Sequence, residues 1–80
     1  MQELIEYIVK AVVDMPDQVD VRQVTSDKVV LIEVRVAADD VGKVIGREGR
    51  IANALRTITK AAAVKDGRRA SLEIIPPDEE

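Results

Sequence analysis

The sequence predicts an α+β domain with the element order α-β-β-α-α-β, in which three helices cover one face of a three-stranded mixed sheet. Three observations predict this class. Apolar residues recur at helical spacing near the start of the chain and again in its second half. β-Branched residues alternate with polar ones in short segments between them. Eighty residues suffice for one modest core, so we expect a single domain over 1–76, followed by an acidic tail over 77–80.

The first helix is expected over residues 2–14, and Pro16 stops it because the proline ring clashes with a preceding helical turn. The apolar residues of this helix are Leu4, Ile5, Ile8, Val9, Val12 and Val13. The alternation over 19–24 predicts the first strand. The polar residues 25–28 predict a turn, which joins this strand to the next one as a hairpin.

The second strand is the clearest, because its β-branched residues favour a strand over a helix. One face of it carries Val30, Ile32, Val34 and Val36. Asp39 or Asp40 is then expected to cap a short helix over 41–45 with a side-chain oxygen. The negative charge of that aspartate also complements the partial positive charge of the helix start.

The segment 46–49 ends the short helix, and a longer helix follows until the Asp-Gly pair at 66–67. Its buried stripe is predicted as Ala52, Leu55, Ile58 and Ala62. Residues 70–75 predict the last strand, which two prolines end. A helical crossover joins the second and third strands, so these strands should lie parallel with a right-handed connection.

Charge is distributed unevenly along the chain. The net charge is −3 at pH 7, yet residues 41–69 hold eight basic and two acidic side chains and therefore carry +6. Residues 1–40 carry −5 and residues 70–80 carry −4. This asymmetry indicates a local anionic partner, while the acidic remainder limits indiscriminate binding.

Two glycines three residues apart, Gly46 and Gly49, bracket a charged pair between the two predicted helices. Glycine has no side chain, so such a loop lets a sugar–phosphate backbone approach the main chain closely. The free amides at the start of the following helix, together with Arg47 and Arg50, predict an anion site. Lys43 is placed to reach the same backbone. The first two strands and the turn between them are expected to form the opposite wall of the groove.

The run Val44–Gly49 resembles the KH signature, and the element order resembles the type II KH fold. Continued to Arg56, the run is similar to that of the small bacterial KhpA proteins. This resemblance implies a protein that binds single-stranded RNA, whose loop clamps about four nucleotides. The RNA-binding residues that it implies are Lys43, Val44, Ile45, Gly46, Arg47, Glu48, Gly49 and Arg50.

The same resemblance implies an RNA chaperone or post-transcriptional regulator with a role in cell-wall growth and cell shape. It implies a homodimer, a pairing with a larger KhpB-like KH-domain partner, or both. Two departures from the KH signature bear on affinity. Many KH signatures have a larger aliphatic residue where this chain has Ala52, and Glu48 places a negative charge inside the loop.

The composition argues against several function classes. The chain contains no histidine and no cysteine, and no Ser or Thr follows Gly42-Lys43 as a P-loop requires. We therefore predict no enzyme, no cofactor, no metal and no small-molecule substrate. No apolar run approaches the ~18 residues that span a membrane, and the absence of cysteine fits the cytoplasm. Two alternatives stay open: an adaptor that keeps the KH fold but has lost most RNA binding, and a single-stranded DNA ligand.

Overall fold

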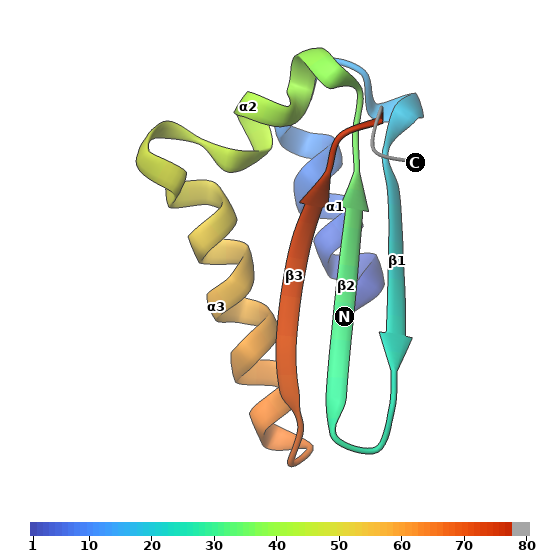
Figure 1. Cartoon of the computed structure of the whole chain (residues 1–80). Coiled ribbons are helices and arrows are strands. Elements are labelled where there is room, and N and C mark those ends of the chain that lie inside the picture. The colour runs from blue at the N-terminus through green and yellow to red at the C-terminus, as the bar shows by residue number, and fades with distance from the viewer. Residues whose placement is uncertain (78–80) are drawn as a thin grey trace.

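The computed structural model of the chain describes residues 1–77 and confirms the predicted α+β class and element order. The helices are α1 (Gln2–Val12), α2 (Val41–Ile45) and α3 (Arg50–Lys65), and the strands are β1 (Asp20–Thr25), β2 (Val29–Arg35) and β3 (Arg69–Ile75). Figure 1 shows α1 behind the sheet, α3 alongside β3 and α2 across the top. Apart from Pro77, the predicted acidic tail lies outside the described residues.

The sheet has the strand order β1-β2-β3, with β1 and β2 antiparallel and β2 and β3 parallel. Both the hairpin and the parallel crossover are therefore confirmed. The central strand carries the core, because Val30, Ile32 and Val34 are buried on its inner face beneath the helices. Val21 of β1 and Leu72 of β3 pair with this row and are also buried.

Helix α1 ends two residues earlier than predicted. Val13 is already extended, with φ −96° and ψ 160°, and the next two amides leave the helix for a side-chain acceptor. The amides of Asp14 and Met15 donate to the Asp40 carboxylate at 3.1 and 3.0 Å. A distant carboxylate thus supplies the hydrogen bonds that a further helical turn would have made, and Pro16 then opens a short 3₁₀ turn.

The same contact corrects the predicted helix cap. Asp40 does stand at the N-cap position of α2, but its side chain makes no capping hydrogen bond to that helix. Its carboxylate is 1% exposed and is directed instead at the chain that follows α1. A 3₁₀ turn over Ala38–Asp40 leads into α2 in place of a side-chain cap.

The buried stripe of α3 also differs from the prediction. The buried residues are Ala52, Leu55, Thr59 and Ala63, whereas Ile58 is 36% exposed. The next buried residue after Leu55 is Thr59, four positions further along the helix. A prediction from hydrophobicity alone would not place a threonine in the core. Its hydroxyl donates to the Leu55 carbonyl at 2.8 Å, so the polar group is satisfied inside the core.

Candidate nucleic-acid interface

A tight corner joins α2 to α3 and projects from the upper left of the molecule in Figure 1. Gly46 has φ 79° and ψ 171°, and Gly49 has φ 76° and ψ 15°. Between them Glu48 is also left-handed, at φ 58°. The Gly49 amide closes the corner by donating to the Gly46 carbonyl at 3.1 Å. The main chain therefore turns sharply between α2 and α3.

The two loop glycines are required for different reasons. A Cβ on Gly46 would lie 2.8 Å from Cγ1 of Ile51 and 3.0 Å from the Ile51 amide nitrogen, so packing as well as conformation excludes a side chain there. A Cβ on Gly49 would meet only the Asn53 side chain, at 3.7 Å. Gly49 is thus required by its left-handed φ alone, and the space above it is open to a ligand.

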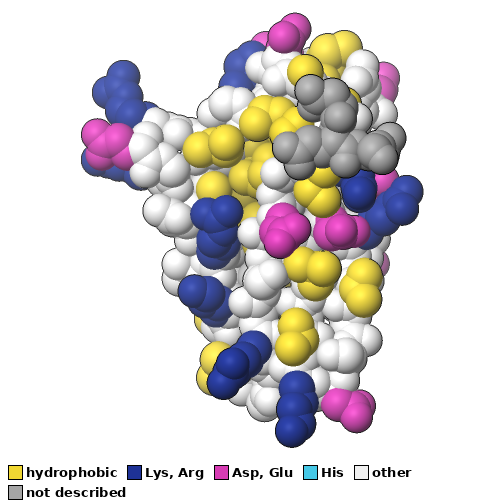
Figure 2. Space-filling model, viewed as in Figure 1, with side chains coloured by type: hydrophobic (Ala, Val, Ile, Leu, Met, Phe, Trp, Pro, Cys, Tyr) yellow, Lys and Arg dark blue, Asp and Glu magenta, His cyan; other side chains and the backbone are white. Residues whose placement is uncertain are grey.

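The corner carries both signs of charge. Arg47, Glu48 and Arg50 are all exposed, and Figure 2 shows basic and acidic side chains projecting together at this edge. The guanidinium of Arg50 lies 4.0 Å from the Glu48 carboxylate, a solvent-exposed pair that stabilises little. The Arg50 amide donates to the Arg47 carbonyl. No side chain among the described residues caps the start of α3, so the amides that follow Arg50 in the first turn can bind an anion.

Lys43 faces away from this corner. Its ammonium donates to the Asp14 carboxylate and lies 3.6 Å from Asp40. The hydrogen bond that Lys43 donates to Asp14, together with the charges of both aspartates, outweighs partial burial, so the pKa of Lys43 is raised. For Asp40, burial opposes ionisation, but the two backbone hydrogen bonds and Lys43 together hold its pKa below the usual value. A direct contact of Lys43 with RNA stays a prediction.

The two aliphatic residues before the corner point in opposite directions. Val44 is fully buried in the core, whereas Ile45 is 39% exposed on the outer side of α2. Ile45 is therefore the member of the pair that can touch a ligand directly. Val44 can act only by fixing the position of α2 against the core.

Two hollows lie along the line where α3 meets β3, further along α3 than this corner. One hollow of about 310 Å³ is lined by Arg56, Lys60 and residues 70–73. An adjoining hollow of about 300 Å³ is lined by Lys60, Val64, Arg68, Arg69 and Ala70. The two share Lys60 and Ala70, and together we call them the α3–β3 trough. Figure 2 shows a column of Lys and Arg side chains on this side of the molecule.

The prediction for the opposite wall of the groove was wrong. It was assigned to the first two strands, but β1 lies at the far edge of the sheet and β3 is the strand that packs beside α3. The wall is therefore the outer edge of β3. Strand order could not be read from β-branched alternation, which gives strands but not their neighbours.

The outer edge of β3 offers main-chain hydrogen-bonding groups to the trough. The Arg69 amide donates to the carbonyl of Lys28, the residue just before β2, and therefore faces the β2 side. Because peptide groups alternate along a strand, those of Ala70, Leu72 and Ile74 face the other way. Arg56 confirms this direction, since its Nε donates to the Leu72 carbonyl at 3.3 Å across the trough.

Sequence reasoning did not assign the trough residues to the site. Four of these residues were included in the basic segment 41–69 but were assigned no role in binding: Arg56, Lys60, Arg68 and Arg69. One signal was available, because Arg56 and Lys60 stand four residues apart and must share a side of α3. Arg69, the first residue of β3, and Arg68 just before it join them only through tertiary structure.

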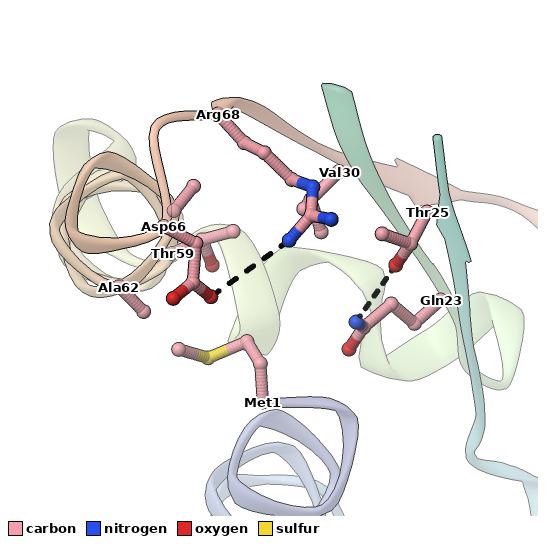
Figure 3. Close-up of a pocket in the computed structure, with 9 residues that line it drawn as sticks. Met1, Gln23, Thr25, Val30, Thr59, Ala62, Asp66 and Arg68 are labelled. Carbon is pink, nitrogen blue, oxygen red and sulfur yellow. Dashed lines mark hydrogen bonds and ion pairs between the residues drawn. The ribbon is translucent and has the colours of Figure 1, made fainter. Parts of the chain in front are cut away.

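A third hollow, of about 230 Å³, is shown in Figure 3; it lies at the end of α3 away from the glycine corner and shares Arg68 with the trough. Its polar groups are already paired. Gln23 accepts from the Gln2 amide at 3.0 Å and donates to Thr25 at 3.0 Å, while Arg68 lies 3.9 Å from Asp66. We therefore assign it no role in binding.

Within residues 1–77, no cluster of three or more His, Cys, Asp or Glu side chains is placed to hold a metal ion. In the same part of the chain, no helix is both long and apolar enough to cross a membrane.

Comparison with known proteins gives a consistent result. The family described as "KhpA/KhpB, KH domain" matches residues 2–74. A protein of Clostridium acetobutylicum named "RNA-binding protein KhpA" is 52% identical over 75 residues, which cover 94% of this chain and all of the relative. A protein of the same name from Borreliella burgdorferi is 51% identical over 73 residues, or 91% of this chain and 89% of the relative. No solved structure matches the chain significantly.

Proposed function

The chain belongs to the KhpA/KhpB family of KH domains, and from that premise we propose that it binds single-stranded RNA. The observation that carries the proposal is the α3–β3 trough, a basic channel along α3, the helix that follows the side-chain-free corner of Gly46 and Gly49. The relatives' own name, RNA-binding protein, supports the same ligand.

The RNA backbone crosses the corner on the open side of Gly49, where Arg47, Arg50 and the first amides of α3 attract phosphates. The bases then lie in the trough against aliphatic surface, with their edges toward the outward-facing peptide groups of β3, where Arg56 already donates to the Leu72 carbonyl. The single aromatic residue of the chain, Tyr7, lies on α1. Base stacking on aromatic side chains therefore plays no part in this mode.

The strength of such binding follows from charge. If two to four phosphates are neutralised, the logarithm of affinity falls with the logarithm of salt concentration at a slope of about −1.4 to −2.8. A lone domain is therefore expected to bind weakly. Two copies would present two troughs and raise the overall affinity.

The test is a titration of the 15N-labelled protein with unstructured oligoribonucleotides at low ionic strength. We expect amide shifts at Gly46, Gly49 and Leu72. Absence of any shift at the corner contradicts the proposal. A parallel titration with the matching oligodeoxyribonucleotides distinguishes RNA from single-stranded DNA.

A double variant, Arg47→Asp with Glu48→Asp, separates RNA binding from an adaptor role. Aspartate tolerates the left-handed conformation of position 48 better than most residues, so the fold should persist. The control variant is Lys10→Glu, at an exposed position of α1, which changes the net charge by the same amount at a site outside the trough. We expect the double variant to lose RNA crosslinking and Lys10→Glu to keep most of it. Unchanged crosslinking of the double variant favours the adaptor. The observation behind this alternative is the negative charge that Glu48 places inside the loop.

We further propose self-association through the helical side of the molecule. Three large apolar side chains on the helices are exposed: Leu4 and Tyr7 of α1 and Ile58 of α3. The most exposed of them is Tyr7, at 75%. Met1 lines one hollow together with Ala62, so the start of α1 lies near the end of α3. An exposed apolar surface of this kind is typical of a contact between proteins.

The partner on that side is a second copy or a KhpB-like protein, which the family name supports. Light scattering over a concentration series tests the homodimer. We expect Tyr7→Glu with Ile58→Glu to be monomeric, and Val24→Glu, at an exposed position on the open face of the sheet, to behave as wild type. A monomeric wild-type protein at all concentrations contradicts the homodimer.

The cellular role that we propose is RNA chaperoning or post-transcriptional regulation in the cytoplasm, with an effect on cell-wall growth and cell shape. Family membership alone supports this part. Deletion of the gene, followed by sequencing of crosslinked RNA and measurement of cell dimensions, tests it. Normal dimensions in the deletion strain contradict the cell-shape role.

A further inference from the structure

One face of the sheet carries no helix in the described part of the chain. Val30, Ile32 and Val34 of β2 are buried on the helical side, so the alternate residues of that strand point to the opposite face. Figure 2 views this opposite face, since α1 lies behind the sheet in the same view. We call it the open face. The strand register gives its members: Asp20, Arg22 and Val24 of β1, Val29, Leu31, Glu33 and Arg35 of β2, and Arg69, Ser71, Glu73 and Ile75 of β3.

Two glutamates lie side by side on the open face. Glu33 and Glu73 are direct partners in the register of the parallel strands β2 and β3, and Figure 2 shows acidic side chains together at the middle of this face. Like charges at facing positions of neighbouring strands destabilise a sheet. Arg35 lies 3.7 Å from Glu33, whereas Glu73 is exposed and makes no ion pair within residues 1–77. The Glu73 carboxylate therefore does not serve the stability of the fold.

Exposed aliphatic side chains adjoin the two glutamates. Leu31 stands two residues before Glu33 on the same strand and is the register partner of Val24. Val24 is 57% exposed and Val29 is 44% exposed. The open face thus combines aliphatic surface with two adjacent negative charges. This combination is complementary to a chain segment that carries lysine or arginine beside aliphatic residues.

We propose that the open face binds a basic, aliphatic segment of another protein. A cationic side chain of that segment lies between Glu33 and Glu73 and relieves their repulsion, while its aliphatic neighbours cover Val24 and Leu31. Nucleic acid does not fit here, because the two carboxylates repel phosphates. A second copy does not fit either, since a two-fold contact centred on the glutamates brings the same negative charges against each other.

The probes for this site are two amidated octapeptides, one of alternating arginine and valine and one of alternating glutamate and valine. Each is titrated into the 15N-labelled wild-type protein at low ionic strength. We expect the basic peptide to shift the amides of Leu31, Glu33 and Glu73 and to leave those of Gly46 and Gly49 in place. The acidic peptide should shift no amide of the open face.

Glu73→Gln removes one charge of the pair and keeps the size of the side chain. It should leave the free energy of unfolding unchanged or higher, because repulsion is lost. Its affinity for the basic peptide should fall about two- to fivefold. The matched control is Glu3→Gln, which removes the same charge from an exposed position of α1 and should bind the peptide as wild type does. Because Glu73 also borders the α3–β3 trough, RNA affinity is measured too, and neither variant should bind RNA more weakly.

The results separate the possibilities. Weaker peptide binding by Glu73→Gln with undiminished stability, and no such loss in Glu3→Gln, supports the proposal. It is overturned if the basic peptide shifts no amide of the open face, if the acidic peptide shifts the same amides, or if Glu73→Gln binds the peptide as tightly as wild type. Lower stability of Glu73→Gln overturns the premise that the fold does not need this carboxylate. These readouts do not involve RNA, so this proposal can fail while the proposed function stands.

Discussion

Gly46→Ala is expected to destabilise the domain more than Gly49→Ala, although the two glycines are equivalent in a Gly-x-x-Gly motif. At Gly46 the angles φ 79° and ψ 171° belong to a region that only glycine readily occupies. Gly49, at φ 76° and ψ 15°, is in the ordinary left-handed helical region. Their surroundings differ as well, because Ile51 packs directly over Gly46.

The magnitudes follow from these two terms. At Gly46 the backbone conformation costs about 1–3 kcal/mol for alanine, and overpacking against Ile51 adds about 1–3 kcal/mol. At Gly49 only the left-handed conformation contributes, about 1–2 kcal/mol, since the nearest atom to a Cβ is 3.7 Å away. A domain of 80 residues has a total unfolding free energy of about 4–12 kcal/mol. Gly46→Ala therefore removes a large part of it.

Urea denaturation followed by circular dichroism at 25 °C measures both variants. A background variant, Ile51→Ala, sharpens the test, because truncating Ile51 removes the side chain that an alanine at position 46 would strike. We expect the destabilisation by Gly46→Ala to be smaller in that background, because the 2.8 Å contact with Cγ1 is lost, although the contacts with the amide nitrogen and Cβ of residue 51 remain. Equal destabilisation by Gly46→Ala and Gly49→Ala, or no relief from Ile51→Ala, refutes the reasoning.

Three further predictions concern the charged groups. The folded-state pKa of Asp40 is lowered, so its ionised form stabilises the fold above the unfolded pKa of about 3.9. Wild type should therefore exceed Asp40→Asn in stability at neutral pH, and the difference should shrink as pH falls below about 4, as denaturation at several pH values would show. Lys43→Ala should weaken RNA binding less than Arg47→Ala in anisotropy titrations, because the Lys43 ammonium is held at Asp14 and Asp40. Lys60→Ala should make the salt slope of RNA binding less negative by about 0.7, if this side chain neutralises one phosphate.

Local patterns were enough to predict the elements of this fold. The 3.6-residue and two-residue periods placed every helix and strand within a few positions, and the helical crossover predicted the parallel pairing of β2 with β3. The misplaced stripe of α3 has a local cause. Thr59 can be buried because its hydroxyl bonds to Leu55, and a hydrophobicity count cannot register that bond.

The site was predictable only in part, because some of it is assembled by distant segments. The glycine corner is contiguous in sequence and was found. The α3–β3 trough depends on which strand lies beside α3, and the partners of Asp40 come from residues 14 and 15. Helical and strand periodicities relate only neighbouring residues of one element, so they cannot predict a contact between residues 14 and 40. The hydrogen-bonding demand of a buried carboxylate explains the contact only once the fold is known.

The edge of β3 also affects how copies of this protein behave in concentrated solution. An edge strand with free peptide groups is a template onto which a strand of another molecule can add. Here the Arg56 side chain occupies the Leu72 carbonyl, and Lys60 and Arg69 bring positive charge to any approaching copy. We expect this protection to weaken at high salt, which screens repulsion between exposed charges. The surface that would guide a nucleic acid into the trough thus also keeps one sheet from joining another.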